Sequence, residues 1–467
     1  MEKYSIDLEG IEIAKYKKIA QHIKKLIDDN KIKDGEKLPA IRSLASLLKV
    51  NNVTIVSAYN KLENEGYAVQ KIGSGTYAKR KETSVNFKKR YSKVVRKISG
   101  EKSKSYIDFS GEAASSDMFS VSSFKDVINK VLERDGTDAL VYQEALGYEG
   151  LRESIDKYFW NNTVGKDNIL IVSGAQQGID IVSKALLNVN DNVVVEKPTY
   201  GGALTVFKWR RTNVIEIDLR EDGMDLDQLE KILKKNKVKC VYLMSYFQNP
   251  TGISYSIQKK RRLLNMAEIY DFYIIEDDYL SELIYNDDEY ISFKSIDTND
   301  RVIYIKSFSK IFLPGIRLGY LISPNVFKES IQNSKVNTDI ATSSLMQRVL
   351  DMYIKEGMWK GHIKKLNEVY EKRYFYMKNV LNSLHEHISF ILPGGGLHFY
   401  IKIKDEFINS MDLFYKCQEQ GVLITPGIIF YKNPEEGKGY FRVSFSQTDL
   451  PAIENGLQII KNIFEEY

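Results

Sequence analysis

Short apolar runs alternate with longer amphipathic stretches along the middle of the chain. The runs are rich in β-branched and aromatic residues and occupy residues 169–172, 241–244, 272–275 and 302–305. Runs of this length and composition are typical of buried strands. Polar side chains or glycines follow each run, and in an open α/β sheet ligands bind outside the carboxyl ends of the strands. The pattern therefore predicts an α/β domain. From about residue 325 it becomes helical, with strands expected again at 397–403 and 440–445.

The first 80 residues show a different pattern. Residues 11–27 are amphipathic with helical spacing, a second helix is expected to begin at Pro39, and a third runs from about 52 to 65 and ends at Gly66. Residues 67–78 form a predicted two-stranded wing. Two helices joined by so tight a turn fit a helix-turn-helix, whose second helix enters the major groove. For the pattern alone, a small structural helical domain is the default interpretation.

Charge divides the chain in the same way. Residues 1–105 hold 24 Lys and Arg against 12 Asp and Glu, whereas the remainder holds 43 against 50. A basic front on an acidic body is typical of a nucleic-acid-binding module fused to a metabolic domain. Cys240 and Cys417 are far apart and support neither a disulfide framework nor a metal site. With no long apolar run and no leader, the protein is expected in the cytoplasm, without contact with a membrane.

The candidate chemistry centres on Lys310. This lysine follows the expected strand 302–305 and lies beside Ser307 and Ser309. Burial lowers the pKa of an amine, which suits a lysine that must attack a carbonyl and form a Schiff base. Seven residues on, Arg317 supplies a planar fork suited to a phosphate. A surface loop with a solvated arginine is the alternative for this stretch.

Side chains after other expected strands could bind the same cofactor as Lys310. Asn249 follows one expected strand and Asp277 another. An aspartate that faces a pyridinium nitrogen keeps it protonated, which makes the ring an electron sink. The turn at Gly174 starts a predicted helix whose free backbone N–H groups are a natural phosphate site. The combination indicates pyridoxal 5′-phosphate (PLP) as cofactor.

These motifs resemble fold-type I aminotransferases. The resemblance is carried by Ser-Phe-Ser-Lys at 307–310, Pro-Gly-Ile-Arg-Leu-Gly-Tyr at 314–320, Asn-Pro-Thr-Gly at 249–252 and Glu-Asp-Asp-Tyr at 276–279. It implies that Lys310 forms the Schiff base, that Asp277 faces the ring nitrogen, and that Asn249 and Tyr279 bind the phenolic oxygen. Pattern and resemblance together give as cofactor-binding residues Lys310, Asp277, Asn249, Tyr279, Tyr200, Gly174, Ala175, Gln176, Ser307, Ser309, Arg317 and Tyr142.

The resemblance also assigns roles to three outlying residues. Arg442 matches the arginine that holds a substrate α-carboxylate, Tyr200 would stack on the cofactor ring, and Tyr142 would reach the partner's cofactor phosphate across a dimer interface. The alternatives are an exposed strand arginine, a core tyrosine and ordinary interface packing. Lys310, Asp277 and Tyr279 are the catalytic candidates.

The front of the chain resembles the GntR-type winged helix over about 70 residues. The matching stretches are residues 38–45, 53–59, 62–67 and 73–76. The residues implied to contact DNA are Arg42, Asn51, Asn52, Thr54, Ser57, Lys71 and Gly75. Many relatives carry arginine where Asn52 and Ser57 stand, so the contacts here are expected to differ. Residues 81–105 are interpreted as a flexible basic linker, with a solvated basic helix near DNA as the alternative.

The whole chain thus resembles the MocR subfamily of GntR regulators. The expected architecture is an N-terminal winged helix-turn-helix (α+β, residues 11–80) and a linker (81–105), followed by an α/β fold-type I PLP-dependent transferase domain (106–467). That domain divides at about residue 325 into a large part and a small C-terminal α+β subdomain. The function implied is a homodimeric regulator that binds a double-stranded DNA operator and senses PLP, an amino acid or an amine. An active aminotransferase with an accessory DNA-binding domain is the alternative, and the intact residue set disfavours a cofactor-free repressor.

Overall fold

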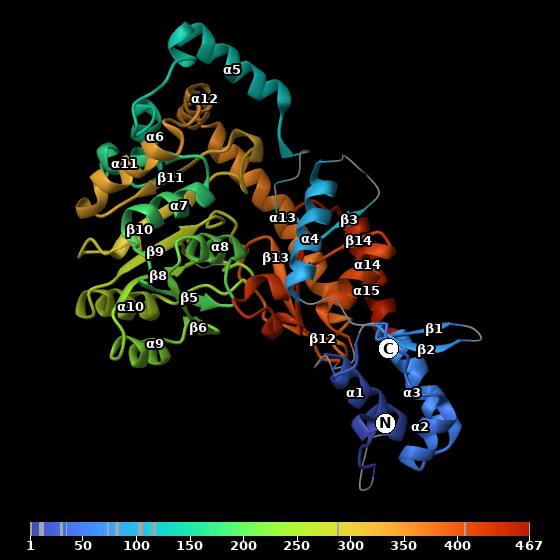
Figure 1. Cartoon of the computed structure of the whole chain (residues 1–467). Helices are drawn as coiled ribbons and strands as arrows, with labels where there is room; N and C mark the ends of the chain where they lie inside the picture. Colours follow the sequence, from blue (N-terminus) through green and yellow to red (C-terminus); the bar gives the residue numbers. More distant parts are fainter. Residues whose placement is uncertain are drawn as a thin grey trace. The chain divides into compact units, whose positions relative to one another are not determined.

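The computed structural model describes residues 2–8, 14–28, 31–33, 35–71, 74–79, 84–100, 106–112, 114, 118–286, 289–405 and 408–466. The chain divides into two compact units, Met1–Arg96 and Lys97–Tyr467 (Figure 1). Each unit has its own hydrophobic core.

The first unit is a winged helix-turn-helix, as expected. Its elements are η1 Glu2–Tyr4, α1 Lys15–Asp28, α2 Ile41–Leu48, α3 Asn52–Asn64, β1 Ala68–Lys71 and β2 Gly75–Ala78. Leu44, Ile55 and Leu62 bring α2 and α3 onto a core shared with α1. The hydroxyl of Tyr59 donates to the carbonyl of Pro39 at 2.6 Å, which ties α3 to the start of α2.

The second helix begins at Ile41 and not at Pro39, because the preceding residues belong to the wing: Leu38 N donates to Thr76 O at 2.9 Å. The expected start of the first helix, at residues 11–13, lies outside the described residues.

Most of the expected linker is helical. Ser84–Gly100 form α4, which is the alternative interpretation of this segment and not the flexible one. Phe87 and Tyr91 are one helical turn apart, both are buried, and their rings stack at 6.2 Å between centroids. Two aromatic side chains with helical spacing therefore give the segment an apolar face despite its many lysines and arginines.

The second unit is built on an eight-stranded sheet. The strand order is β4-β11-β10-β9-β8-β5-β6-β7, and only β11 and β7 run antiparallel to their neighbours. The strands are β4 Ile169–Val172, β5 Asn192–Lys197, β6 Asn213–Arg220, β7 Gly223–Met224, β8 Val238–Leu243, β9 Tyr273–Asp278, β10 Val302–Ser307 and β11 Gly319–Ile322. All four apolar runs of the sequence are strands of this sheet.

Helices cover both faces of the sheet. Val193 and Val195 point to the face covered by α7 Ala175–Leu186 and α8 Gly201–Trp209, whereas Val194 points to the face covered by α9 Leu226–Leu233 and α10 Ile257–Ile269. Figure 1 shows β8, β9 and β10 between α7 on one side and α9 and α10 on the other. Burial on both faces explains why these strands are continuous apolar runs.

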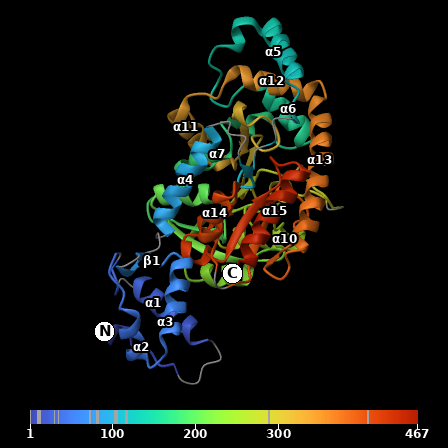
Figure 2. The same cartoon turned by 90° about the vertical axis from the view of Figure 1, so that its right-hand side faces the viewer.

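The remainder of the second unit surrounds this sheet. Further helices are α5 Val121–Asp135, α6 Glu149–Phe159, α11 Lys328–Asp339 and α12 Ser344–Lys355. The small C-terminal part has the antiparallel order β12-β13-β16-β15, and α13 packs along α15 beside it (Figure 2). Its elements are α13 Met358–Asn382, β12 Ile388–Phe390, β13 His398–Ile403, α14 Ser410–Glu419, β15 Thr425–Pro426, β16 Tyr440–Ser444 and α15 Leu450–Glu465. A separate parallel pair joins β3 Ile107–Asp108 to β14 Val422–Leu423.

Candidate cofactor site

The predicted site residues gather at one edge of the large sheet. Because β4, β5, β8, β9 and β10 are parallel, their carboxyl ends lie together. Gly174 follows β4, Tyr200 follows β5, Asn249 follows β8, and Lys310 follows β10, while Asp277 is the next-to-last residue of β9. The strand topology therefore brings residues more than a hundred positions apart into one site.

A phosphate-sized cradle forms at the start of α7. Gly174 is the N-cap, at φ +91°, and no side chain caps the helix, so the first backbone N–H groups of Ala175 and Gln176 have no side-chain acceptor there. Arg317 donates to Ser309 Oγ at 3.1 Å and to Ser173 O at 3.0 Å. A guanidinium, a hydroxyl and a helix N-terminus together favour a doubly charged anion.

Glycine is required in this cradle. A Cβ on Gly174 would lie 3.0 Å from Arg317 Nη2 and 3.6 Å from Ser309 Oγ. It would fill the space between the groups that face the anion, and its φ of +91° is unfavourable for any other residue.

Two neighbouring aspartates have opposite environments. Both carboxylate oxygens of Asp278 accept hydrogen bonds. The donors are the Tyr304 hydroxyl at 2.6 Å, Lys306 Nζ at 3.0 Å and the backbone N–H of Ser281 at 3.1 Å. Burial alone would raise the pKa of Asp278, but the charge of Lys306 and the hydrogen bonds outweigh it and lower the pKa. Asp278 is therefore a structural anion.

Asp277 keeps one oxygen open. Its Oδ2 accepts from the Tyr242 hydroxyl at 2.6 Å, whereas Oδ1 is buried and has no hydrogen-bond partner among the described residues. Burial raises the pKa of Asp277 to about 7, and the Tyr242 hydrogen bond only partly offsets this. A carboxylate in this position gains most from a cationic hydrogen-bond donor, and a protonated pyridine nitrogen is such a donor.

Lys310 lies beside a buried charge cluster. Its Nζ is 4.0 Å from Oε2 of Glu112, and 35% of its side chain is exposed. Burial lowers the pKa of Lys310; Glu112 opposes this, and the charges of Arg442 and Arg317 add to it. A lowered pKa leaves more of the amine unprotonated and able to attack a carbonyl.

Arg442 is held by partners from within the chain. It donates to Asn249 Oδ1 at 2.8 Å and to Ser110 O at 2.9 Å, and its Nη1 is 3.0 Å from Oε1 of Glu112. Asn249 in turn donates to Glu112 Oε2 at 3.2 Å. The expected carboxylate-binding arginine thus already faces a carboxylate.

The remaining predicted site residues differ in burial and in their hydrogen-bond partners. Tyr200 is half-buried, its hydroxyl donates to Gln176 at 3.2 Å, and burial with the charge of Asp277 raises its pKa to about 12. Ser307 is buried and accepts from Ser309 N at 3.2 Å. The hydroxyl of Tyr279 donates to the carbonyl of Phe247 at 2.7 Å, so it has an acceptor within the chain. Tyr142 is 81% exposed.

The residues fit PLP. The cradle at Gly174 suits its phosphate, the open oxygen of Asp277 suits its ring nitrogen, and Lys310 is the nearby amine. No group of three or more His, Cys, Asp and Glu side chains in the described ranges could hold a metal ion. None of the helices in those ranges combines the length and the apolar character needed to span a bilayer.

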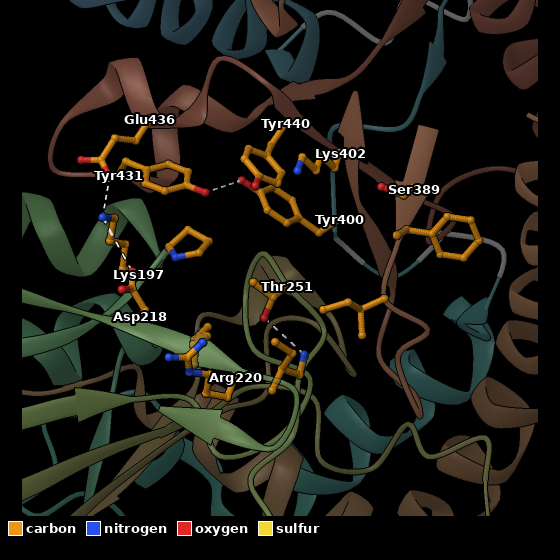
Figure 3. Close-up of a pocket in the computed structure, with 15 residues that line it drawn as sticks. Lys197, Asp218, Arg220, Thr251, Ser389, Tyr400, Lys402, Tyr431, Glu436 and Tyr440 are labelled. Atoms are coloured by element: carbon orange, nitrogen blue, oxygen red, sulfur yellow. Dashed lines mark hydrogen bonds and ion pairs between the residues drawn. The ribbon is translucent and has the colours of Figure 1, made fainter. Parts of the chain in front are cut away.

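A cavity lies beside the turn that carries Asn249, and Thr251 of that turn lines it. It has a volume of about 640 Å³ and opens between the ends of β5 and β6 and the small C-terminal sheet. Figure 3 shows Tyr400, Tyr431 and Tyr440 on one wall and Arg220 and Thr251 on the other. Neither Lys310 nor Asp277 lines this cavity, so it is separate from the cofactor cradle.

In the first unit, the residues implied to contact DNA differ in their solvent exposure and in their hydrogen bonds within the chain. Arg42, Asn52, Lys71 and Gly75 are exposed, and Ser57 is half-buried. Asn51 caps α3: its Oδ1 accepts from Thr54 N at 3.0 Å and from the Thr54 hydroxyl at 2.8 Å. Asn51 and Thr54 therefore shape the start of the recognition helix.

Both units match known families. Residues 112–460 match the family "Aminotransferase class I and II" and residues 15–78 match "Bacterial regulatory proteins, gntR family". The chain belongs to the class I and II aminotransferases. Family members depend on PLP, and the joined GntR head gives the arrangement expected of MocR-type regulators.

Named relatives fall into two groups. A protein named "Uncharacterized HTH-type transcriptional regulator YdfD", from Bacillus subtilis, is 28% identical over 96% of this chain and 95% of its own length. Aromatic-amino-acid aminotransferase 1 of Thermococcus litoralis is 30% identical over 77% of this chain and 88% of its own. The solved kynurenine aminotransferase of Pyrococcus horikoshii, in complex with PMP, has a TM-score of 0.76 at 29% identity, covering 81% of this chain and 94% of its own.

Three residues that contact the site were not predicted from the sequence. Glu112 lies in a segment with no periodicity, and His398 sits within β13, where a lone histidine carries no signal. Tyr242, in β8, could have been found, because alternation along the strand places it on the same face as Cys240. Its hydroxyl then needs a buried acceptor, and Asp277 on the adjacent strand is the natural one.

Proposed function

We propose that this aminotransferase-family protein is a PLP-dependent, sequence-specific DNA-binding regulator. The observation that carries the proposal is the co-occurrence, in one chain, of a GntR-type winged helix and a site with an open Asp277 oxygen, a glycine cradle and Lys310. The proposed domain limits are 11–80 for the head, 81–105 for the connection and 106–467 for the cofactor domain.

Each site residue has a defined task. Gly174, Ala175, Gln176, Ser309 and Arg317 hold the phosphate, with Ser307 orienting Ser309. Asp277 would accept a hydrogen bond from the ring nitrogen, Tyr200 would lie against the ring, and Lys310 would hold the cofactor covalently. Bound PLP supplies an electron sink for amino compounds. Asn249 and Tyr279 are the proposed partners of the phenolic oxygen, which would replace their present acceptors, Glu112 for the Asn249 amide and the Phe247 carbonyl for the Tyr279 hydroxyl.

The head contacts DNA through α2 and α3. Arg42 and Asn52 are exposed and supply the groove contacts, while Lys71 and Gly75 lie on the wing. A homodimer would carry two such heads and bind two half-sites. Tyr142 follows the exposed apolar pair Leu140 and Val141, a surface suited to the partner subunit. Access to DNA puts the protein in the cytoplasm.

Regulation then requires coupling between the two units. A ligand shifts the arrangement of the heads only if it binds one arrangement better than another. The effector is PLP itself or an amino compound that reacts at Lys310.

An active aminotransferase is the second candidate. It is favoured by the complete residue set around Lys310 and by the relative from Thermococcus litoralis, which is named as an aminotransferase. Weak or partial transamination is compatible with both candidates.

One experiment separates the two. The full chain is tested for binding to its own upstream DNA, and the same samples are assayed for transamination and for PLP fixed by borohydride. Specific binding, loss of affinity by about 1–3 kcal/mol in Arg42→Ala, and mass-spectrometric attachment at Lys310 support the regulator. Rapid turnover with weak, cofactor-indifferent DNA binding would make the protein an enzyme first.

A further inference from the structure

Glu112 places a carboxylate inside the candidate site. The residue is buried, with 4% of its side chain exposed, and it follows the short strand β3. Its Oε1 is 2.7 Å from His398 Nδ1 and 3.0 Å from Arg442 Nη1, and its Oε2 accepts from Asn249 at 3.2 Å. Burial alone would raise the pKa of Glu112, but Arg442 and His398 outweigh it and lower the pKa far below its usual range. Glu112 is therefore a fixed negative charge.

The guanidinium of Arg442 is enclosed. One terminal nitrogen contacts Asn249 and Glu112, and the other donates to Ser110 O at 2.9 Å and Thr425 Oγ1 at 3.4 Å. The ring of Phe430 lies 5.3 Å from its central carbon. A carboxylate that binds an arginine bidentately needs two free N–H groups side by side, and both terminal nitrogens already face acceptors of the chain.

A ligand carboxylate would also meet repulsion. To reach Arg442 it must either lie against Glu112 or drive Glu112 out of its pocket. Like charges brought together in a buried site repel each other strongly, and a displaced Glu112 would leave His398 and Asn249 without their partner. A protonated amine meets the opposite field, because Glu112 lies 4.0 Å from the amine of Lys310, where the ligand nitrogen arrives.

We infer that Glu112 is a specificity-determining residue which makes the site select primary amines that lack an α-carboxylate over α-amino acids. The inference rests on the proposed function, since it concerns ligands that react at Lys310. It replaces the role that family resemblance gives Arg442: here Arg442 anchors Glu112 and is not open to a ligand.

The test compares matched ligand pairs on the cofactor-loaded full chain. Each α-amino acid is paired with the amine that lacks its carboxyl group: L-phenylalanine with 2-phenylethylamine, and L-lysine with 1,5-diaminopentane. The dissociation constants come from the change in cofactor absorbance and from ligand-induced shifts of the unfolding temperature. Wild type should bind each amine at least about tenfold more tightly than its amino acid, since tenfold corresponds to only a fraction of the repulsion.

Two variants isolate the charge. Glu112→Gln keeps the size and removes the charge, and should tighten amino-acid binding about tenfold while weakening amine binding. Glu112→Asp keeps the charge and should retain the wild-type order. A wild type that prefers the amino acids, or an unchanged ratio in a folded Glu112→Gln, would overturn the inference. If Glu112→Gln does not fold, the ratios of wild type and Glu112→Asp decide alone.

A second measurement needs no cofactor. 3-Phenylpropionate, a carboxylate without an amine, should leave the unfolding temperature of the cofactor-free wild type unchanged and raise that of Glu112→Gln, where Arg442 can accept it. Stabilisation of both proteins alike would overturn the inference. Cofactor fixation on Lys310 and DNA binding are recorded on the same samples, so failure of the proposed function is seen separately from failure of the ligand preference.

Discussion

Replacing Asp277 by asparagine should stabilise the cofactor-free chain at neutral pH while weakening its hold on PLP. Asp277 is fully buried, and the hydroxyl of Tyr242 still finds an acceptor in the amide oxygen of the variant. The substitution removes a buried carboxylate that would have to ionise with no cation beside its unpaired Oδ1.

The size of the effect follows from the pKa of Asp277. The folded value of about 7 lies above the value of about 3.9 for an unfolded aspartate. A raised folded pKa means that the folded state binds the proton more tightly. The stability contributed by this group is therefore fully present below pH 4 and is lost as the pH rises through 7. Between pH 5 and pH 8, wild type should lose about 2–3 kcal/mol from this group, and Asp277→Asn should not.

Urea unfolding of both proteins without cofactor, at pH 5 and pH 8, measures the difference. The matched control is the neighbouring Asp278→Asn. Its carboxylate pairs with Lys306 and has a lowered pKa, so its contribution is present above pH 4 and is lost as the pH falls through the folded value. Removing one partner of a buried pair should cost about 3–5 kcal/mol at both pH values.

The two neighbours should thus respond with opposite signs. A destabilised Asp277→Asn at pH 8 would contradict this expectation, because it would mean that the chain itself already provides a partner for the ionised carboxylate. In that case the unpaired Oδ1 of Asp277 would not explain a loss of PLP affinity in the same variant.

Substitutions at Gly174 and Asn51 test the cradle and the recognition helix. Gly174→Ala should weaken PLP binding, measured by absorbance titration, because its Cβ would lie 3.0 Å from Arg317 Nη2. The control Gly315→Ala has open space around its Cβ and should bind PLP as wild type does. Equal PLP affinities of the two variants would argue against the cradle. Asn51→Ala should lower the thermal stability of the winged helix by about 1 kcal/mol through loss of the α3 cap. Asn51→Asp should keep the cap and stability but bind DNA less tightly; unchanged DNA affinity would mean that the start of α3 does not face phosphate.

The sequence was most informative where one local rule decides the structure. Buried strands such as 302–305 are recognisable because they are apolar on both faces, and Lys310 follows such a strand with its motif intact. The winged helix was predictable from the stretches that resemble the GntR-type head, such as residues 38–45 and 53–59, and not from helix spacing alone. Pro39 is not the start of α2, because Leu38 is hydrogen-bonded to the wing.

The arrangement around Arg442 could not be predicted in this way. Glu112 and Arg442 are far apart in sequence, and they meet only because Ser110 and Gly111 run beside the strand that carries Arg442. Nor does a sequence show which oxygen of two adjacent aspartates stays open. That depends on Tyr242 and Lys306, which lie on the strands to either side of β9.

The most direct test of the account measures DNA affinity with and without PLP in wild type and in Lys310→Ala. Fluorescence anisotropy with the chain's own upstream DNA gives the dissociation constants, and PLP affinity is measured with and without the same DNA. Coupling between sites typically changes affinity about 5- to 150-fold and is reciprocal. PLP should therefore change the DNA affinity of wild type at least about fivefold, DNA should change PLP affinity by the same factor, and Lys310→Ala should show neither effect. A wild type that carries PLP on Lys310 and binds its DNA with unchanged affinity would contradict the account.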